Sequence, residues 1–294
     1  MRVAICLLCG FALVGCFPAR PPASVPSAAH VAARPMSDGS GHNARPTDGG
    51  CGVSPQAVLA ASRRQTPVTS AAPPQATGRE IAGIVFEGVA FDSRSHRLIV
   101  ADQPAGPGSR WPDAAAAAAY HGLAAINAGF FTPEGQPLGQ VVAAGIPVGS
   151  WNRASSLGSG VWLEAANGMP GIRRRESVPA TFAARELVQA GPMLVENHRP
   201  VSGLEATKSS VRSVILWDGG TRWWIGRASS CTLAALGQAL VSGTPGAWPV
   251  CHALNFDGGR SADLAISAEV PGGPLTRRAP WNRPVRNFMV LLAR

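Results

Sequence analysis

The stretch LNFDGGRS, residues 254–261, joins a short apolar run to a polar, glycine-rich ending. The apolar residues are typical of a β-strand, and Gly258 and Gly259 let the backbone turn sharply or approach a ligand closely. Asp257 stands where the strand ends, at the rim of the core, which is a frequent place for a catalytic group. The alternative is an Asp-Gly hairpin turn with a solvated aspartate.

A second segment of this kind is AAINAGFF, residues 124–131. Its apolar run is interrupted by Asn127, whose amide group needs hydrogen-bond partners if it is buried. Asn127 therefore either caps a turn or holds a ligand. The two phenylalanines that end the segment are expected to belong to the core rather than to form a stacking platform.

Two arginines stand in strand-like segments where a charge needs a partner. Arg212 lies among strand-forming residues, and Arg286 lies in the stretch RPVRN, residues 283–287. A buried guanidinium without an anionic partner is too costly, and its planar shape suits a phosphate or a carboxylate. The partner of Arg212 is either such a ligand or the chain's own Asp257.

Outward from these segments, β-type runs alternate with turn signals from Ile81 to the C-terminus. Residues 84–91 and 96–101 are expected to pair as a hairpin across a turn at 92–95. Further strands are expected at 123–130, 160–165, 187–195, 211–217, 223–226, 253–256 and 285–292.

Only two helices are indicated by the sequence. Pro112 opens an alanine-rich one that runs to Tyr120, and the other covers residues 233–241 with Thr232 as its N-cap. The excess of strands over helices predicts an α+β fold. We expect one domain over residues 79–294, built around a mixed, largely antiparallel sheet with few helices.

The chain before this domain divides into a leader and a tether. Residues 1–15 hold one arginine and an uncharged apolar run too short to span a membrane, which is typical of a secretory signal peptide. The run ends in LVGC, which resembles a bacterial lipoprotein cleavage box with Cys16 as the lipid-bearing first mature residue. The alternative is a signal peptide cut elsewhere. Residues 16–78 are rich in Pro, Ala and Ser and are expected to form a disordered tether.

The net charge of the chain does not indicate a particular binding partner. The 294-residue chain has 26 Lys and Arg residues against 17 Asp and Glu residues, for a net charge of +9. The arginines are scattered and no nucleic-acid-binding module is present, so nucleic acid is not an expected partner.

The cysteines divide between the leader and the mature chain. Cys231 and Cys251 are expected to form a disulfide in an oxidising compartment, the alternative being two free thiols, and Cys51 lies alone in the tether. No C-x-x-C or H-x-x-x-H spacing accompanies Cys51, Cys231 or Cys251. No metal site and no cofactor are therefore expected, with a divalent ion left open.

Four motifs, in this order, resemble the phosphodiester glycosidase family: NAGFF at 127–131, QAGPML at 189–194, Arg212-Ser213, and ALNFDGGRS at 253–261. The resemblance covers residues 81–292, and four motifs in register are more specific than any one of them. Members of this family hydrolyse the bond between the anomeric carbon of a sugar and a phosphate. The resemblance implies an exported, lipid-anchored hydrolase of sugar-1-phosphodiesters, such as N-acetylglucosamine-1-phosphodiesters.

The resemblance also implies roles for individual residues. Asp257 would act as acid or base, or stabilise charge on the sugar, and Arg212 and Asn127 would complete the catalytic set. Arg286 would hold the phosphodiester and Asn255 would orient hydroxyl groups or phosphate oxygens. The other residues implied in substrate binding shape the pocket: Gly129, Gly191, Gly258, Gly259, Ser213 and Ser261.

Two departures from the family pattern concern the substrate. Arg260 follows the two glycines where a small residue is usual, and Arg212 is followed by Ser-Val rather than Thr-Ala. His121 and His252 precede the strands of Asn127 and Asp257, and each is either a base or an edge or core residue. One or two of the tryptophans are expected to form a sugar platform, from among Trp151, Trp223, Trp224, Trp248 and Trp281.

The competing function is a non-catalytic, glycan-binding envelope lipoprotein of the same fold. The retained Asn127, Arg212 and Asp257 favour the enzyme. The expected partners are a sugar-phosphate or envelope glycan and, through lipidated Cys16, a membrane. Phe17 stands after the cysteine in place of Asp, which indicates a bacterial outer-membrane location facing the periplasm or the cell surface.

Overall fold

The structure is a computed structural model that describes residues 71–120 and 122–294. The expected signal peptide, Cys16, Cys51 and most of the expected tether lie outside the described residues. In the described part of the chain, no helix has the length and apolar character that crossing a membrane requires.

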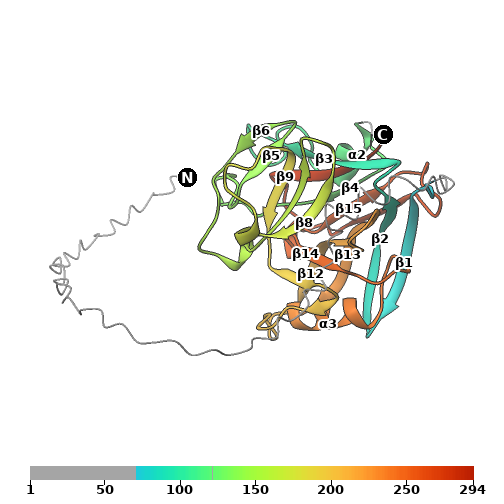
Figure 1. The fold of residues 1–294 in the computed structure, drawn as a ribbon. Helices are drawn as coiled ribbons and strands as arrows, with labels where there is room; N and C mark the ends of the chain where they lie inside the picture. The colour runs from blue at the N-terminus through green and yellow to red at the C-terminus, as the bar shows by residue number, and fades with distance from the viewer. Residues whose placement is uncertain (1–70, 121) are drawn as a thin grey trace, which may run out of the picture. The chain divides into compact units, whose positions relative to one another are not determined.

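Three sheets make up the fold (Figure 1). The largest has seven strands, in the order β1 (Gln75–Ile81), β2 (Ile84–Asp92), β13 (Arg222–Cys231), β12 (Ser210–Trp217), β14 (His252–Asn255), β10 (Met193–Glu196) and β11 (Arg199–Pro200). The second has five, in the order β16 (Leu275–Arg278), β15 (Asp263–Ile266), β4 (Ala124–Asn127), β17 (Asn287–Ala293) and β3 (His96–Asp102). The third orders β6 (Ile146–Val148), β5 (Val141–Ala143), β9 (Ala184–Ala190), β7 (Gly160–Ala165) and β8 (Pro170–Arg174).

Within residues 71–120 and 122–294, two α-helices accompany the sheets, α2 (Ala114–Ala119) and α3 (Leu233–Ser242). α3 begins where the sequence indicates, whereas α2 begins two residues after Pro112, with Asp113 as its N-cap. In both helices a polar side chain satisfies a free amide of the first turn. Asp113 Oδ1 accepts from the amide of Ala116 at 2.8 Å, and Thr232 Oγ1 accepts from that of Ala235 at 3.1 Å. The two predicted helices are confirmed.

The predicted sheet-rich fold with few helices is confirmed, and its details differ. Every pairing between the described strands is antiparallel, so no mixed sheet forms, and the strands divide among three sheets rather than one. The label α+β fits only loosely, since the helices are so few. The first strand begins at Gln75, so residues 75–78, which composition assigns to the tether, belong to the folded part.

Apolar side chains that alternate along the strands build cores on both faces of the large sheet. On β12, Ile215 and Trp217 join the core shared by all three sheets, whereas Val214 and Leu216 pack with Leu236 of α3 on the other face. The shared core holds together strands that are far apart in sequence, and their ends meet in the polar cluster described below.

The predicted hairpin of residues 84–91 and 96–101 is wrong. β2 pairs with β1 and β13 in the large sheet, whereas β3 pairs with β17 in the second sheet. The true hairpin joins β1 to β2 through Ala82 and Gly83, whose φ values of 50° and 76° suit a two-residue turn.

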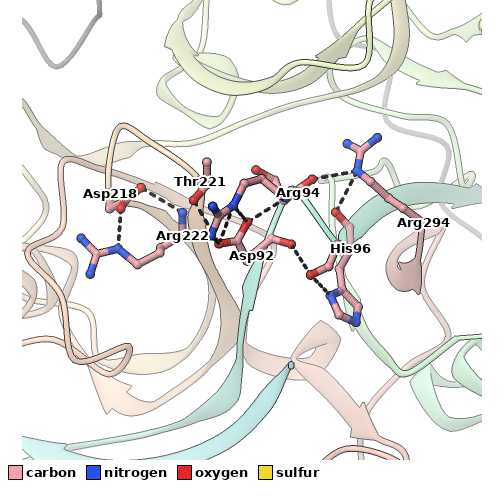
Figure 2. A network of polar contacts seen from close by, with 9 residues as sticks. Asp92, Arg94, His96, Asp218, Thr221, Arg222 and Arg294 are labelled. Carbon is pink, nitrogen blue, oxygen red and sulfur yellow. Dashed lines mark hydrogen bonds and ion pairs between the residues drawn. The ribbon is translucent and has the colours of Figure 1, made fainter. Parts of the chain in front are cut away.

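At residues 92–96, where the chain passes from β2 in the large sheet to β3 in the second sheet, polar contacts hold the turn (Figure 2). The Asp92 carboxylate accepts hydrogen bonds from the Arg94 side chain at 2.7 Å and from the Thr221 hydroxyl at 3.1 Å. Arg294 Nε donates to the carbonyl of Ser93 at 2.7 Å and ties the end of the chain to this turn.

The predicted strand at 187–195 is likewise two strands. β9 lies in the third sheet and β10 in the large one, with Gly191–Pro192 between them. A Cβ on Gly191 would lie 2.2 Å from the Ser156 carbonyl oxygen, so the crossing needs glycine.

The expected disulfide between Cys231 and Cys251 is wrong. Cys231 is a free, buried thiol, whereas Cys251 is disulfide-bonded, so its partner lies outside the described residues. β12 separates the two cysteines: Cys231 lies opposite Ser210, and the residue after Cys251 lies opposite Trp217. Residues 210 and 217 are roughly 23 Å apart at ~3.3 Å per residue, and a disulfide needs Cα atoms within ~7 Å.

Candidate active site

Asn127, at the end of β4, is fully buried and joins three segments. Its Oδ1 accepts hydrogen bonds from Ser213 Oγ at 2.6 Å and from the Asp263 amide at 3.0 Å. Its Nδ2 donates to the Asp257 carbonyl oxygen at 2.6 Å. Both polar atoms of the side chain therefore bond to the protein. Asn127 is a positioning residue that holds β12, β15 and the loop after β14 around one point, and Ser213 serves the same cross-link.

Asp257 follows β14 and carries the carboxyl group at the centre of this cluster. Its amide donates to the Ala128 carbonyl at 2.9 Å, which fixes the backbone, and the residue is 8% exposed. Oδ1 accepts from the Gly258 amide at 2.9 Å, while Oδ2 is buried and makes no hydrogen bond.

Burial raises the pKa of the Asp257 carboxyl above its usual range, while Ser261, the charge of Arg283 and the Gly258 amide act in the opposite direction. A carboxyl group with a raised pKa and a free oxygen is suited to give or take a proton. Asp257 therefore stays the candidate for the acid or base role that the family resemblance implies.

Arg283, in the loop before β17, supplies the cation beside this carboxylate. Its Nη2 lies 3.6 Å from Asp257 Oδ2, and its Nε donates to Ser261 Oγ at 3.3 Å. The guanidinium carbon lies 4.6 Å from the centroid of the Phe131 ring, a cation–π contact, and the side chain is 44% exposed. A half-exposed guanidinium held in this way keeps donors for an anionic ligand.

The loop of Arg283 is tied to the short turn of helix that follows Asp257, η3 (Gly259–Ser261). The Arg283 amide donates to the Arg260 carbonyl at 2.9 Å, and Arg260 Nε donates to the Trp281 carbonyl at 3.1 Å. Trp281 is 69% exposed. The cluster therefore carries an open indole on the same loop as its cation.

The glycines next to Asp257 are required by space and by backbone conformation. A Cβ on Gly258 would lie 2.5 Å from the Val211 carbonyl oxygen of β12, and Gly259 has a φ of +59°. Gly129 differs, because a Cβ there would meet nothing closer than 3.4 Å. Its amide donates to Asn287 Oδ1 at 2.8 Å, so this position contributes a backbone contact.

Two buried amides near Asp257 each keep one atom without a hydrogen bond. Asn255 donates through Nδ2 to the Gly191 carbonyl at 2.9 Å, and its Oδ1 has no partner. Asn287 accepts through Oδ1 from Gly129, and its Nδ2 has no partner. Buried polar groups are nearly always hydrogen-bonded, so these atoms are suited to a polar ligand.

The structure does not bring Arg212 into this cluster. Neighbouring strand residues face opposite sides of a sheet, and Ser213 faces Asn127. Arg212 faces the other side, where it donates to the carbonyls of Lys208 at 2.8 Å and Cys231 at 3.2 Å. Arg212 and Asp257 form no ion pair in the described part of the chain.

Arg286 makes no hydrogen bond or ion pair to Asp257 in the described part of the chain, so its expected role in holding the phosphodiester stays a prediction that this geometry does not favour. It is 2% exposed, and its Nε and Nη2 donate to both oxygens of Asp102, at 2.9 and 3.0 Å. Its Nη1 donates to the Gly135 carbonyl at 2.9 Å. The strand position just before β17 places this side chain in the interior, where a buried partner neutralises it.

His252 does not supply a base at this point. His252 starts β14, at the other end of the strand from Asp257, and burial and the charge of Arg173 lower its pKa to about 4. His121 lies outside the described residues. Among residues 71–120 and 122–294, no group of three or more His, Cys, Asp or Glu side chains is placed to hold a metal ion.

A family model described as phosphodiester glycosidase matches residues 120–292. The chain belongs to the phosphodiester glycosidase family. The resemblance seen in the sequence is confirmed, and all the motifs that carry it fall within the matched residues.

Two solved structures share the fold of this family member. The catalytic domain of zebrafish N-acetylglucosamine-1-phosphodiester alpha-N-acetylglucosaminidase, auto-inhibited by its pro-peptide, matches with a TM-score of 0.51 and 16% identity, over 78% of this chain and 85% of that one. A hypothetical protein from Synechocystis matches with a TM-score of 0.51 and 17% identity, over 76% of this chain and 62% of that one. At such identities the likeness concerns the fold alone. No curated protein sequence matches the chain.

Within this family member, the sequence motifs locate the carboxyl group but not its cation. Asp257, Asn127, Ser213 and the glycines come together, and Arg283 takes the place expected for Arg212 and Arg286. One signal could have found it: Arg283 lies in the same RPVRN stretch as Arg286, and its place before Pro284 favours extended backbone ahead of the strand. Asn287 had no comparable signal.

Proposed function

We propose that the chain hydrolyses the glycosidic bond of sugar-1-phosphodiesters, with Asp257 and Arg283 at the reacting centre. The observation that carries this proposal is the contact between the two residues. Asp257 Oδ2 is buried without a hydrogen bond and lies 3.6 Å from a guanidinium that is half exposed. A proton donor and a phosphate-binding cation are the two groups that the departure of a phosphate from a sugar needs.

The proposed reaction uses one water molecule. Water forms a new bond to the anomeric carbon, and the bond from that carbon to the phosphate oxygen breaks with its electron pair going to the oxygen. Protonated Asp257 gives its proton to the departing oxygen, and Arg283 holds the phosphate and offsets its charge. The proton released by the water restores the carboxyl group, so the products are a free sugar and a phosphate monoester.

Two features support a sugar on one side of the reacting bond. Aromatic faces pack well against the C–H surfaces of a pyranose, and Trp281 is 69% exposed on the loop of Arg283. The zebrafish relative is named for an N-acetylglucosamine-1-phosphodiester, so N-acetylglucosamine is the sugar we propose first.

Product analysis tests the proposal. The purified mature chain is incubated with UDP-N-acetylglucosamine, in which the terminal phosphate of UDP is esterified to the anomeric carbon of the sugar. Free N-acetylglucosamine with intact UDP is the expected result. Release of N-acetylglucosamine 1-phosphate would instead place the cut on the phosphate side, and tight binding without turnover would support a glycan-binding protein; either result would overturn the proposal.

A matched pair of residues provides the control. Asp218 and Arg222 also pair, at 2.7 Å, with a carboxylate that is nearly buried and an arginine that is half exposed, and they lie in the separate network of Figure 2. Asp257→Asn and Arg283→Ala should remove product formation, whereas Asp218→Asn and Arg222→Ala should retain it.

We also propose that the chain is an exported lipoprotein of the bacterial outer membrane, with residues 1–15 as signal peptide and Cys16 as the lipidated residue. The LVGC sequence supports this proposal. Metabolic labelling with an alkyne fatty acid should mark the chain and fail to mark Cys16→Ser, and the labelled chain should fractionate with outer membranes. Equal labelling of the two would exclude Cys16.

A further inference from the structure

Cys251 is disulfide-bonded, although the other cysteine of the described chain, Cys231, is free. The partner is therefore one of the four cysteines of residues 1–70: Cys6, Cys9, Cys16 and Cys51. Cys6 and Cys9 belong to the apolar leader, and Cys16 is the residue proposed to carry the lipid. This leaves Cys51.

A groove lies directly beside Cys251. It has a volume of about 290 Å³ and runs between the C-terminal end of α3 and the segment that leads into β14. Its apolar lining includes Leu240, Val241, Trp248 and Val250, the last of which precedes Cys251 in the chain. Val241 is 38% exposed, whereas Leu240, Trp248 and Val250 are nearly buried, so Val241 is the open apolar position of the groove.

The residues that follow Cys51 include apolar side chains, like the lining of the groove. Residues 52–59 read GVSPQAVL, with four apolar side chains at Val53, Ala57, Val58 and Leu59 and no charge. No other stretch of residues 17–70 has as many large apolar side chains in so short a length. If Cys51 is bonded to Cys251, this stretch starts at the end of the groove.

The length of the chain also permits the arrangement. β1 passes the groove, since Arg79 Nη1 donates to the carbonyl of Thr244, a lining residue, at 3.1 Å. The 28 residues from 51 to 79 can span at most roughly 95 Å at ~3.4 Å per residue. They can therefore leave the groove and return along β1 without strain.

We propose that Cys51 forms the disulfide with Cys251 and that residues 52–59 occupy the groove beside it. The two thiols lose two protons and two electrons, which reduce a disulfide-bearing oxidant of the oxidising compartment to its dithiol. The link fastens the N-terminal segment at the start of β14, six residues from Asp257, which is roughly 20 Å at ~3.3 Å per residue. It thus holds the segment at the end of the strand away from the candidate active site.

Peptide mapping tests the link on the full chain produced with export to an oxidising compartment. Free thiols are alkylated under denaturing conditions, and the chain is digested without reduction and analysed by mass spectrometry. The expected result is a species that joins the peptide of Cys51 to that of Cys251, with Cys231 alkylated. A link from Cys251 to Cys16 or Cys231, or an alkylated Cys251, would overturn the proposal.

Hydrogen exchange tests the groove. In Cys51→Ser, amides of residues 240–250 should exchange at least tenfold faster than in the native chain, and Tm should fall by about 5 °C or more because a long loop is no longer closed. The matched control, Cys231→Ala, removes a thiol that is not in the link and should leave exchange at 240–250 unchanged. Unchanged exchange in Cys51→Ser, with the link mapped in the native chain, would show that residues 52–59 do not occupy the groove.

Discussion

Arg283 lies with its guanidinium carbon 4.6 Å from the Phe131 ring centroid and its Nη2 3.6 Å from Asp257 Oδ2. The aromatic ring and the carboxylate both contact the guanidinium. This leaves a charged group held in place and still half exposed, which is what binding of a phosphate requires.

Replacement of Arg283 should reduce activity and also change its pH dependence. Arg283→Gln is expected to lower kcat/KM at least 100-fold, because the phosphate loses its cation. The positive charge also lowers the pKa of Asp257, so its removal should raise that pKa further. If protonated Asp257 is the acid, the fall of kcat/KM with rising pH should move to higher pH. Initial rates measured from pH 4 to 9 check both effects. An unchanged pH profile would show that the charge of Arg283 does not affect the pKa of the catalytic acid.

Asp257→Asn should stabilise the fold while it removes activity. The folded pKa of this carboxyl is raised by burial, so its contribution to stability is present below the unfolded pKa, near 3.8, and is lost as the pH rises through the folded pKa. At pH 7 the folded state must either bury a carboxylate or take up a proton, and asparagine avoids that free-energy cost. We expect Tm to rise by about 2 °C at pH 7 and to stay equal at pH 3. A lower Tm at pH 7 would mean that the contact with Arg283 outweighs burial.

Arg286 should matter for stability and not for substrate. Arg286→Ala leaves the buried Asp102 carboxylate without its cation and should cost about 3–5 kcal/mol, or a Tm fall of about 10 °C. The double variant Arg286→Met, Asp102→Leu should recover most of that loss. In both variants kcat per folded molecule should stay within about threefold of the native value, because the side chain is 2% exposed. A 100-fold loss of kcat in a folded variant would contradict this prediction and show that Arg286 acts on the substrate.

His252 should make the fold sensitive to moderate acid. Its folded pKa of about 4 lies below the ordinary histidine value of 6.5, because of burial and the nearby charge of Arg173. The stability that neutral His252 contributes is therefore present above pH 6.5 and is lost as the pH falls toward 4. Thermal unfolding of native chain and His252→Gln should show a steeper fall of Tm in the native chain across this range. Parallel curves would contradict the shifted pKa.

Local patterns along the sequence were sufficient to predict several elements of this protein. Thr232 and its neighbours specify the start of α3, because an N-cap acts within one turn of helix. The DGG sequence indicates a tight backbone after a strand, and Gly258 is needed because the Val211 carbonyl lies so close. Motifs of this kind identify the family because their chemistry is confined to a few adjacent residues.

Which strands become neighbours was decided only by the tertiary structure. Residues 84–101 look like a hairpin, yet β2 and β3 lie in different sheets, because pairing depends on partners more than a hundred residues away. The same holds for the arginines. Arg286 and Arg283 have similar surroundings in the sequence, but folding buries one against Asp102 and leaves the other beside Asp257. Sequence spacing determines which face of a strand a side chain takes, whereas the identity of its charged partner depends on how distant segments pack, and that depends on the core as a whole.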